Sequence, residues 1–220
     1  MLRNKFQMEL DALNLELVEL GVVVSNIICD SVQALEEHNL ELCNGVIDIA
    51  HQTRTKIDEI EDKALKIMLM QQPVACDLRT ITTALKIVTD LDRISKQARE
   101  ICHIVLDLGE NEHLFDIKIL HTMGTLATAM VNDCVQSFVK MDLQLAEKVI
   151  NQDDSMDRYF SSLKEQMLEK IKSKSENADS VLYFMMIGKY LEKIGDFAES
   201  IAQWVKYSKL GVRRGKVLKG

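Results

Sequence analysis

The sequence predicts an all-α protein built from two tandem, pseudo-symmetric three-helix bundles. Apolar residues recur at helical spacing along almost the whole chain. The 220 residues include one proline and nine glycines, too few for a β-rich fold with many tight turns. The second half of the chain also repeats motifs of the first. With 47% hydrophobic and 28% charged residues, the composition is that of an ordered globular protein.

The pattern predicts six long helices separated by short breaks. Their expected bounds are 4–36, 40–70, 77–107, 115–139, 143–172 and 179–208. Asn39, Asp77 and Asp142 are the expected N-caps of the second, third and fifth helices. In the third helix, one series alternates steps of three and four, which predicts the buried seam of a bundle. That series is Ile81, Ala84, Val88, Leu91, Ser95, Ala98, Cys102 and Val105.

An internal repeat divides the chain into two halves. The segment "DLDRISKQAREI" (90–101) aligns with "YLEKIGDFAESI" (190–201), and "CNGVIDIAHQTR" (43–54) aligns with "AEKVINQDDSMD" (146–157). The two offsets differ by three residues, which a connecting loop absorbs. We therefore expect one bundle over residues 1–110, a second over 111–208, and a basic tail over 209–220.

Charge and hydropathy favour a soluble cytoplasmic protein. The net charge of −7 argues against a nucleic-acid partner, because phosphate contacts need clustered Lys and Arg. The near-apolar run at 20–29 is too short to span a bilayer, and the N-terminus resembles no signal peptide. The bases from Lys206 onward suit either a frayed solvated end or a contact with an acidic partner or anionic lipid.

The cysteines indicate neither a disulfide framework nor a zinc site. They are isolated, odd in number and without a Cys-x-x-Cys pair, and they stand at Cys29, Cys43, Cys76, Cys102 and Cys134. We expect them to be small buried hydrophobic residues in a reducing compartment.

Three segments of the chain resemble the PhoU family of phosphate-uptake regulators. They are "QQPVACDLR" (71–79), "DLDRI" (90–94) and "YLEKIGDFAESIAQWV" (190–205), and the resemblance extends over essentially the whole chain. It implies two similar three-helix bundles and a non-enzymatic cytoplasmic regulator that is often a homodimer. The implied partners are the ATPase subunit of a phosphate ABC transporter and a phosphate-sensing histidine kinase, so that any membrane association is peripheral and made through them.

The resemblance also implies a metal site made by carboxylate pairs on two helices. In the second bundle the matching residues are Asp153, Asp157, Glu192 and Asp196, with Glu199 one turn further. Within each pair the spacing is i, i+4, which places both carboxylates on one face of a helix. Four oxygen donors suit hard or borderline cations such as Mg²⁺, Mn²⁺, iron or zinc. A solvated acidic face is the alternative interpretation of the same residues.

The first bundle departs from that carboxylate pattern. The matching positions hold Ala50, Arg54, Asp92 and Lys96, so two of them carry positive charge. Because cations repel a metal ion, we expect no metal there and expect Asp92 to pair with the two bases.

The competing interpretation is a carboxylate-bridged di-iron oxidase, which would be an enzyme, or a metal-storage protein. A di-iron site needs two Glu-x-x-His motifs, and only "EICH" (100–103) fits. The scattered histidines His51, His103, His113 and His121 are expected at the surface or at helix caps. The sequence contains no glycine-rich phosphate loop and no Gly-x-Ser-x-Gly elbow. We therefore predict no catalytic residues, and no segment of the sequence predicts a phosphate site.

Overall fold

The structure is a computed structural model that describes residues 2–71, 75–108, 117–173 and 178–211. Within these ranges the chain forms only helices. They are α1 (Leu2–Glu37), α2 (Leu40–Gln71), α3 (Ala75–Leu108), α4 (Lys118–Val139), α5 (Leu143–Ser173) and α6 (Ala178–Leu210). The predicted all-α fold of two three-helix bundles is therefore confirmed.

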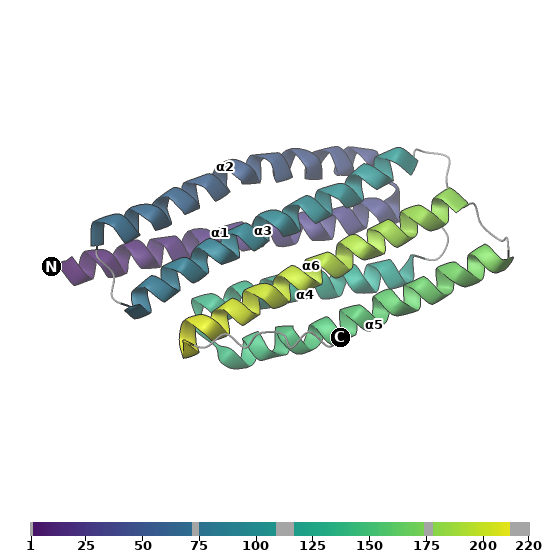
Figure 1. Ribbon diagram of the computed structural model, residues 1–220. Helices are drawn as coiled ribbons and strands as arrows, with labels where there is room; N and C mark the ends of the chain where they lie inside the picture. The colour runs from purple at the N-terminus through teal and green to yellow at the C-terminus, as the bar shows by residue number, and fades with distance from the viewer. Residues whose placement is uncertain (1, 72–74, 109–116, 174–177, 212–220) are drawn as a thin grey trace.

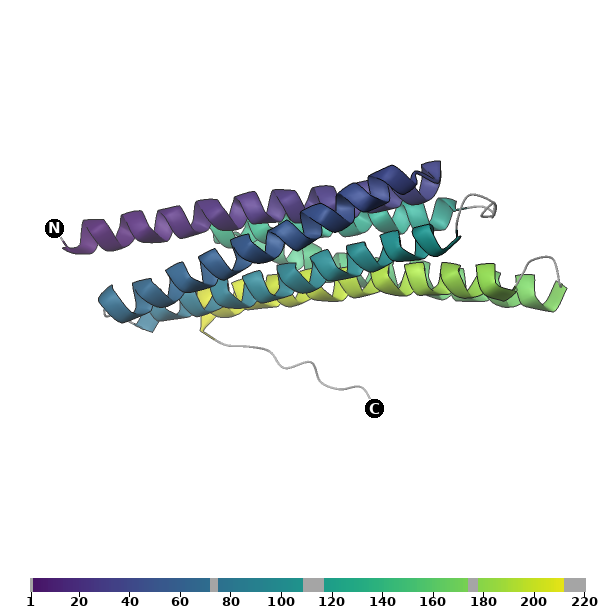
Figure 2. The same cartoon turned by 90° about the horizontal axis from the view of Figure 1, so that it is seen from above.

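The six helices form two bundles that lie side by side. Figure 1 shows α2 along one edge and α5 along the opposite edge, with α1, α3, α4 and α6 between them. Helix α2 contacts α1 and α3, whereas α5 contacts α4 and α6. The bundles meet through α1 against α4 and α3 against α6. Seen from above, the assembly is long and slender (Figure 2).

The contact between the bundles is reciprocal, as a pseudo-two-fold axis requires. A Cβ added at Gly21 of α1 would lie 2.9 Å from Val135 Cγ2 of α4, and one at Gly124 of α4 would lie 2.5 Å from Val32 Cγ2 of α1. Helices α3 and α6 run antiparallel (Figure 1). The two halves of the repeat therefore form two bundles related by a pseudo-two-fold axis, and the equivalent helices α3 and α6 run in opposite directions.

Polar contacts between α3 and α6 show the same reciprocity. Ser200 hydrogen-bonds Asp90, while Glu100 is close enough to Tyr190 to raise the pKa of that phenol, after the larger effect of burial. Residues 90 and 190, and residues 100 and 200, are equivalent in the sequence repeat. The repeat therefore extends from sequence to individual contacts between the bundles.

The predicted seam of the third helix is buried throughout. Ile81, Ala84, Val88 and Leu91 belong to the core, and the buried series continues to Val105. The hydrophobic core runs through both bundles without interruption. The seam prediction is confirmed because a period of three and four keeps one face of a helix toward its neighbours.

Two of the three predicted caps are confirmed. The Asn39 side chain accepts a hydrogen bond from the Leu42 amide at 3.0 Å, and Asp142 Oδ1 accepts from the amides of Gln144 and Leu145 at 2.9 and 3.1 Å. The prediction for Asp77 is wrong, because α3 already begins at Ala75. Asp77 instead lies in the first turn, where its negative charge favours the positive end of the helix dipole.

Cysteine burial follows the prediction with one correction. Cys43, Cys102 and Cys134 are buried and free, but Cys29 is exposed on α1. The Cys76 side chain, His113 and the tail from residue 212 lie outside the described residues. Burial raises the pKa of the Cys134 thiol well above its ordinary value, which keeps the sulfur protonated.

Helix α1 is long and apolar enough to cross a membrane by composition alone. Its most apolar window lies within Lys5–Glu37 and has a mean hydropathy of 1.7. The apolar character of this helix therefore extends beyond the short run at 20–29. The same helix packs on α2, α3 and α4 and buries Leu13, Leu17 and Leu20. A central core helix meets the same criteria for length and hydropathy.

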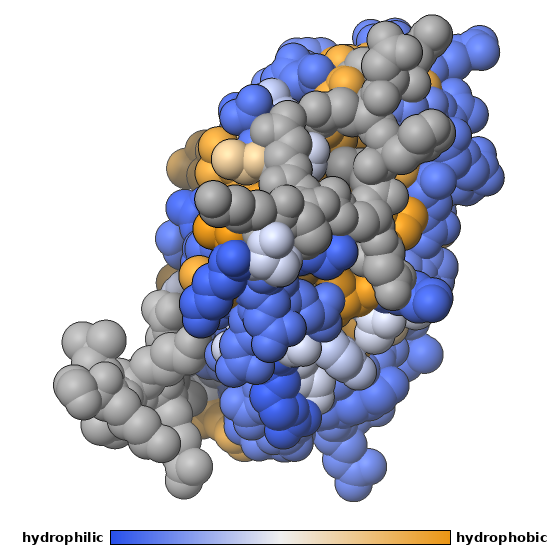
Figure 3. Space-filling view, turned by 90° about the vertical axis from the view of Figure 1, so that its right-hand side faces the viewer, coloured by the Kyte–Doolittle hydropathy of each residue, from blue (hydrophilic) through white to orange (hydrophobic). Residues whose placement is uncertain are grey.

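Figure 3 shows the end of the molecule at the right of Figure 1, where hydrophilic surface predominates around smaller apolar patches.

Candidate metal centre and its charge-inverted counterpart

The predicted metal residues of the second bundle lie on α5 and α6. Asp153 is buried, with 8% of its surface exposed. Its Oδ1 lies 3.4 Å from the position of a Cβ at Gly195, so this carboxylate is directed at α6. Glu192 and Asp196 are half-buried on α6, on either side of the turn that contains Gly195. Asp157 is exposed on α5.

Two lysines form ion pairs with the α6 carboxylates Glu192 and Asp196. Lys189 Nζ lies 2.7 Å from Glu192 Oε2, and Lys193 Nζ lies 2.5 Å from Asp196 Oδ2 and 3.6 Å from Glu192 Oε2. The hydrogen bond to Asp196 is the main cause that raises the pKa of Lys193. These ion pairs offset the repulsion that i, i+4 carboxylates otherwise exert on each other.

Among the residues that the structure describes, no three His, Cys, Asp or Glu side chains are gathered as a group that could hold a metal ion. Glu199, expected to extend the acidic strip, is buried at 7% exposure and accepts a hydrogen bond from Gln203 at 2.7 Å. A cation on this bundle would therefore have to displace Lys189 and Lys193 and draw the side chains together. The metal-site assignment stays a prediction.

In the first bundle, Asp92 pairs with the two bases as predicted. Lys96 Nζ lies 2.6 Å from Asp92 Oδ2, and Arg54 Nη1 lies 3.4 Å from the same oxygen. Arg54 also bridges to Asp58 at 2.8 Å. The guanidinium and ammonium groups thus belong to the residues that match Asp157 and Asp196, so the sign of the charge is inverted at two of the four positions.

The inverted site contains a cavity that the sequence pattern did not predict. Its volume is about 110 Å³, and it is lined by Ala50, His51, Arg54, Asp92, Ser95, Lys96 and Arg99. Ser95 was expected in the core seam and is buried there. Arg99 was missed, although the repeat aligns it with Glu199 and so carried the signal of a second charge reversal.

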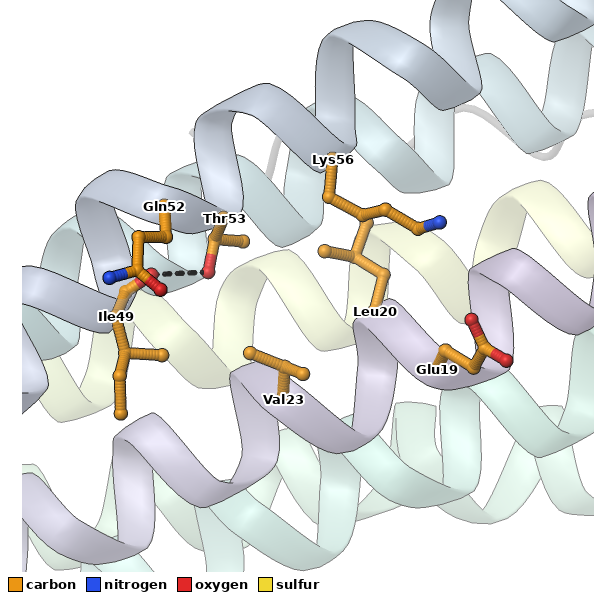
Figure 4. Close-up of a pocket in the computed structure, with 7 residues that line it drawn as sticks. All are labelled: Glu19, Leu20, Val23, Ile49, Gln52, Thr53 and Lys56. Carbon is orange, nitrogen blue, oxygen red and sulfur yellow. Dashed lines mark hydrogen bonds between the residues drawn. The ribbon is translucent and has the colours of Figure 1, made fainter.

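A larger hollow lies between α1 and α2. Figure 4 shows Glu19, Leu20 and Val23 of α1 opposite Ile49, Gln52, Thr53 and Lys56 of α2, around a cavity of about 300 Å³. The Thr53 hydroxyl donates a hydrogen bond to the Ile49 carbonyl at 2.7 Å and is turned back to its own helix. The lining contains no His or Cys, and its two charged residues are opposite in sign.

The residues of the alternative di-iron motif are not arranged as ligands. Glu100 pairs with Arg99 at 3.1 Å, and His103 is exposed on α3. His121 is also exposed and contacts Glu36. The expectation that these two histidines lie at the surface is confirmed, and nothing in the described residues favours the oxidase interpretation.

Comparison with known proteins places this geometry in a family. The PhoU domain model matches residues 17–105 and 120–205, one copy in each bundle. The chain is 30% identical over 208 residues to a phosphate-specific transport system accessory protein PhoU homolog of Clostridium acetobutylicum, covering 94% of this chain and 95% of the relative. It is 24% identical to the PhoU accessory protein of Escherichia coli, covering 92% and 84%.

Solved structures show the same fold. The crystal structure of PhoU from Pseudomonas aeruginosa superposes with a TM-score of 0.87 at 28% identity, covering 94% of this chain and all of that one (100%). The phosphate transport regulatory protein PhoU from Streptococcus pneumoniae superposes with a TM-score of 0.89 at 23% identity, covering 96% and 99%. With two domain matches and a full-length relative, the chain belongs to the PhoU family.

Proposed function

We propose that this protein is a non-enzymatic cytoplasmic regulator of phosphate uptake and phosphate-starvation signalling. The observation that carries the proposal is the double PhoU match along the whole chain, together with relatives named as accessory proteins of the phosphate-specific transport system. Its partners are the ATPase subunit of a phosphate ABC transporter and a sensor histidine kinase. A homodimer is the proposed working form.

The experiment is a co-purification from cells grown with abundant and with limiting phosphate. Tagged full-length protein is captured from detergent-solubilised membranes and from cytosol, and bound proteins are identified by mass spectrometry. We expect the transporter ATPase or the kinase to be enriched over a tagged helical protein of similar charge. Folded bait that enriches neither of them contradicts the proposal.

We further propose that the second bundle binds a divalent or trivalent cation through Asp153, Asp157, Glu192 and Asp196. Two observations support it: the donor set is all oxygen, and Asp153 is buried and directed at α6 beside Gly195. The bound ion would neutralise these carboxylates and link α5 to α6. Because Lys189 and Lys193 already contact the α6 carboxylates, binding also releases both ammonium groups to solvent.

Metal addition should raise the melting temperature of the wild type, because a ligand that binds only the folded state stabilises it by mass action. The Glu192→Gln/Asp196→Asn variant should lose that rise with Mg²⁺, Mn²⁺, Zn²⁺ and iron. Glu165→Gln/Glu169→Gln is the matched control, since it removes two exposed carboxylates at the same spacing on α5. Elemental analysis should find the same metal content in Asp92→Asn as in the wild type. A wild type that none of the four metals stabilises would refute the site.

A further inference from the structure

The lining of the first-bundle cavity is rich in cationic side chains. Arg54, Lys96 and Arg99 line it together with a single carboxylate, Asp92. Two further acids lie beside it but not in its lining: Asp58 pairs with Arg54 and Glu100 pairs with Arg99. The lining itself carries three cations and one anion, but with Asp58 and Glu100 the whole cluster is neutral, so an anionic ligand would be held by hydrogen-bond donors in the lining and not by net charge.

Arg99 supplies a buried donor that lacks a partner. Its Nε is buried, and within the described residues it makes no hydrogen bond. Buried polar atoms in proteins are nearly always paired with protein, water or ligand, so this guanidinium donor beside the cavity can accept a partner from water or from a bound ligand. Arginine presents its donors in a fixed fork that suits the oxygens of phosphate and carboxylate. The Ser95 hydroxyl adds another polar group to the same wall.

The size of the cavity restricts the ligand to a small ion. Its volume of about 110 Å³ exceeds several-fold the roughly 10–15 Å³ of cavity space that a single water molecule needs. A tetrahedral oxyanion fits this space, whereas a nucleotide does not. Arg54 and Lys96 are each about half exposed at the rim, with side-chain exposures of 54% and 50%, so a small ion can enter between them.

Asp92 would distinguish among oxyanions. Its side chain is 15% exposed, and both bases contact Oδ2, which leaves Oδ1 as the oxygen to accept a hydrogen bond from a ligand. An ionised carboxylate only accepts hydrogen bonds. Near neutral pH inorganic phosphate keeps at least one proton to donate, whereas sulfate keeps none, so that only phosphate can offset its repulsion from Asp92 with a hydrogen bond. Such an unfavourable contact is an effective source of specificity.

We propose that this cavity binds inorganic phosphate. Arg54, Lys96 and Arg99 donate hydrogen bonds to the anion, and the phosphate hydroxyl donates a hydrogen bond to Asp92. The binding site stands on the cavity itself, while its meaning as a sensor of phosphate rests on the proposed function. With this site the first bundle would bind an anion, whereas the second bundle would bind a cation.

The test is equilibrium dialysis of the full-length protein with radiolabelled phosphate at constant ionic strength set with chloride. We expect one phosphate per chain, with affinity reduced roughly tenfold or more in Arg54→Gln/Arg99→Gln, because hydrogen bonds to charged groups are lost. Arg158→Gln/Lys164→Gln is the matched control, since it removes two exposed cations from α5 and leaves the cavity unchanged. Equal affinity in the cavity variant and the control, or no saturable binding by the wild type, overturns the proposal.

Sulfate gives an independent measurement of the role of Asp92. The wild type should prefer phosphate, and Asp92→Asn should gain sulfate affinity relative to phosphate. A wild type that binds both ions equally overturns the proposal, as does a protein that binds vesicles containing phosphatidic acid but not free phosphate. Circular dichroism verifies folding, and the single variant Lys96→Gln, at a half-exposed side chain, replaces the double variant if that one fails to fold. Dialysis needs no partner, so its result is separate from that of the co-purification.

Discussion

Asp90 is a carboxylate placed at the contact between α3 and α6. It is buried, accepts a hydrogen bond from Arg93 at 3.1 Å, and is also bonded by Ser200 of the other bundle. Burial is the largest effect on its pKa and raises it, while the bonds to Ser200 and Arg93 lower it in part. The charged form is therefore disfavoured in the folded protein, because water no longer solvates it fully.

This raised pKa predicts how stability depends on pH. Because the folded state holds the proton more tightly than the unfolded state, the contribution of Asp90 to stability is present below the ordinary Asp pKa and is lost as the pH rises through the raised pKa. Asp90→Asn lacks this loss. The melting temperature of Asp90→Asn minus that of wild type should therefore increase as the pH rises through this window.

Ser200→Ala provides the companion measurement. Removing a bond that lowers the pKa of Asp90 should raise that pKa further, which moves the window to higher pH. A difference between Asp90→Asn and wild type that shrinks as the pH rises contradicts the assignment.

At the scale of the elements, two close approaches between α1 and α4 set the distance between the bundles. Gly124 leaves room for Val32, and Gly21 leaves room for Val135. Small residues at helix crossings allow the facing side chains to enter the space that a Cβ would fill. Valine cannot turn away, because its branched side chain has one strongly preferred rotamer in a helix.

Gly124→Ala should therefore destabilise the protein. The new Cβ would lie 2.5 Å from Val32 Cγ2, and overpacking of this kind costs about 1–3 kcal/mol. The higher helix propensity of alanine offsets about 1 kcal/mol of that cost. Urea unfolding measures the net change in the free energy of unfolding, and Val32→Ala in the same chain should relieve the loss.

Gly45→Ala is the matched control on α2. A Cβ there would meet nothing within 4 Å, so the substitution should stabilise the protein by up to about 1 kcal/mol. If Gly124→Ala and Gly45→Ala stabilise equally, the close approach does not constrain the helices.

At the scale of the whole molecule, the two bundles share one core and should unfold together. Helices α1 and α3 are covered on one side by α4 and α6. A fragment of residues 1–110 would expose that side to water and lose the apolar burial that stabilises it. We expect the fragment to melt at a lower temperature than the full chain and to bind a hydrophobic dye.

The full chain, by contrast, should show a single cooperative transition. Calorimetry and circular dichroism should give the same midpoint for it. A monomeric 1–110 fragment that melts at the temperature of the full chain would show instead that each bundle is an independent domain.

The helices, the buried seam of α3 and the charge inversion could all be predicted from residue patterns along the chain. Periodicity of three and four depends only on helical geometry, so the buried face of α3 could be identified residue by residue. The pairing of Asp92 with Arg54 and Lys96 could be predicted because the repeat aligned these residues with carboxylates of the second bundle. The caps at Asn39 and Asp142 also depend on local contacts alone.

The surroundings of those residues could not be predicted, because they depend on how the helices pack against one another. Lys189 precedes Glu192 by three residues, and Lys193 precedes Asp196 by three. Whether each lysine contacts its carboxylate or extends into solvent depends on the rotamer that packing selects. The place of Arg99 in the cavity depends on how α2 crosses α3, and the burial of Asp90 depends on the antiparallel contact of α3 with α6. Periodicity specifies which face of a helix is buried, but the helix that covers this face is selected by long-range packing.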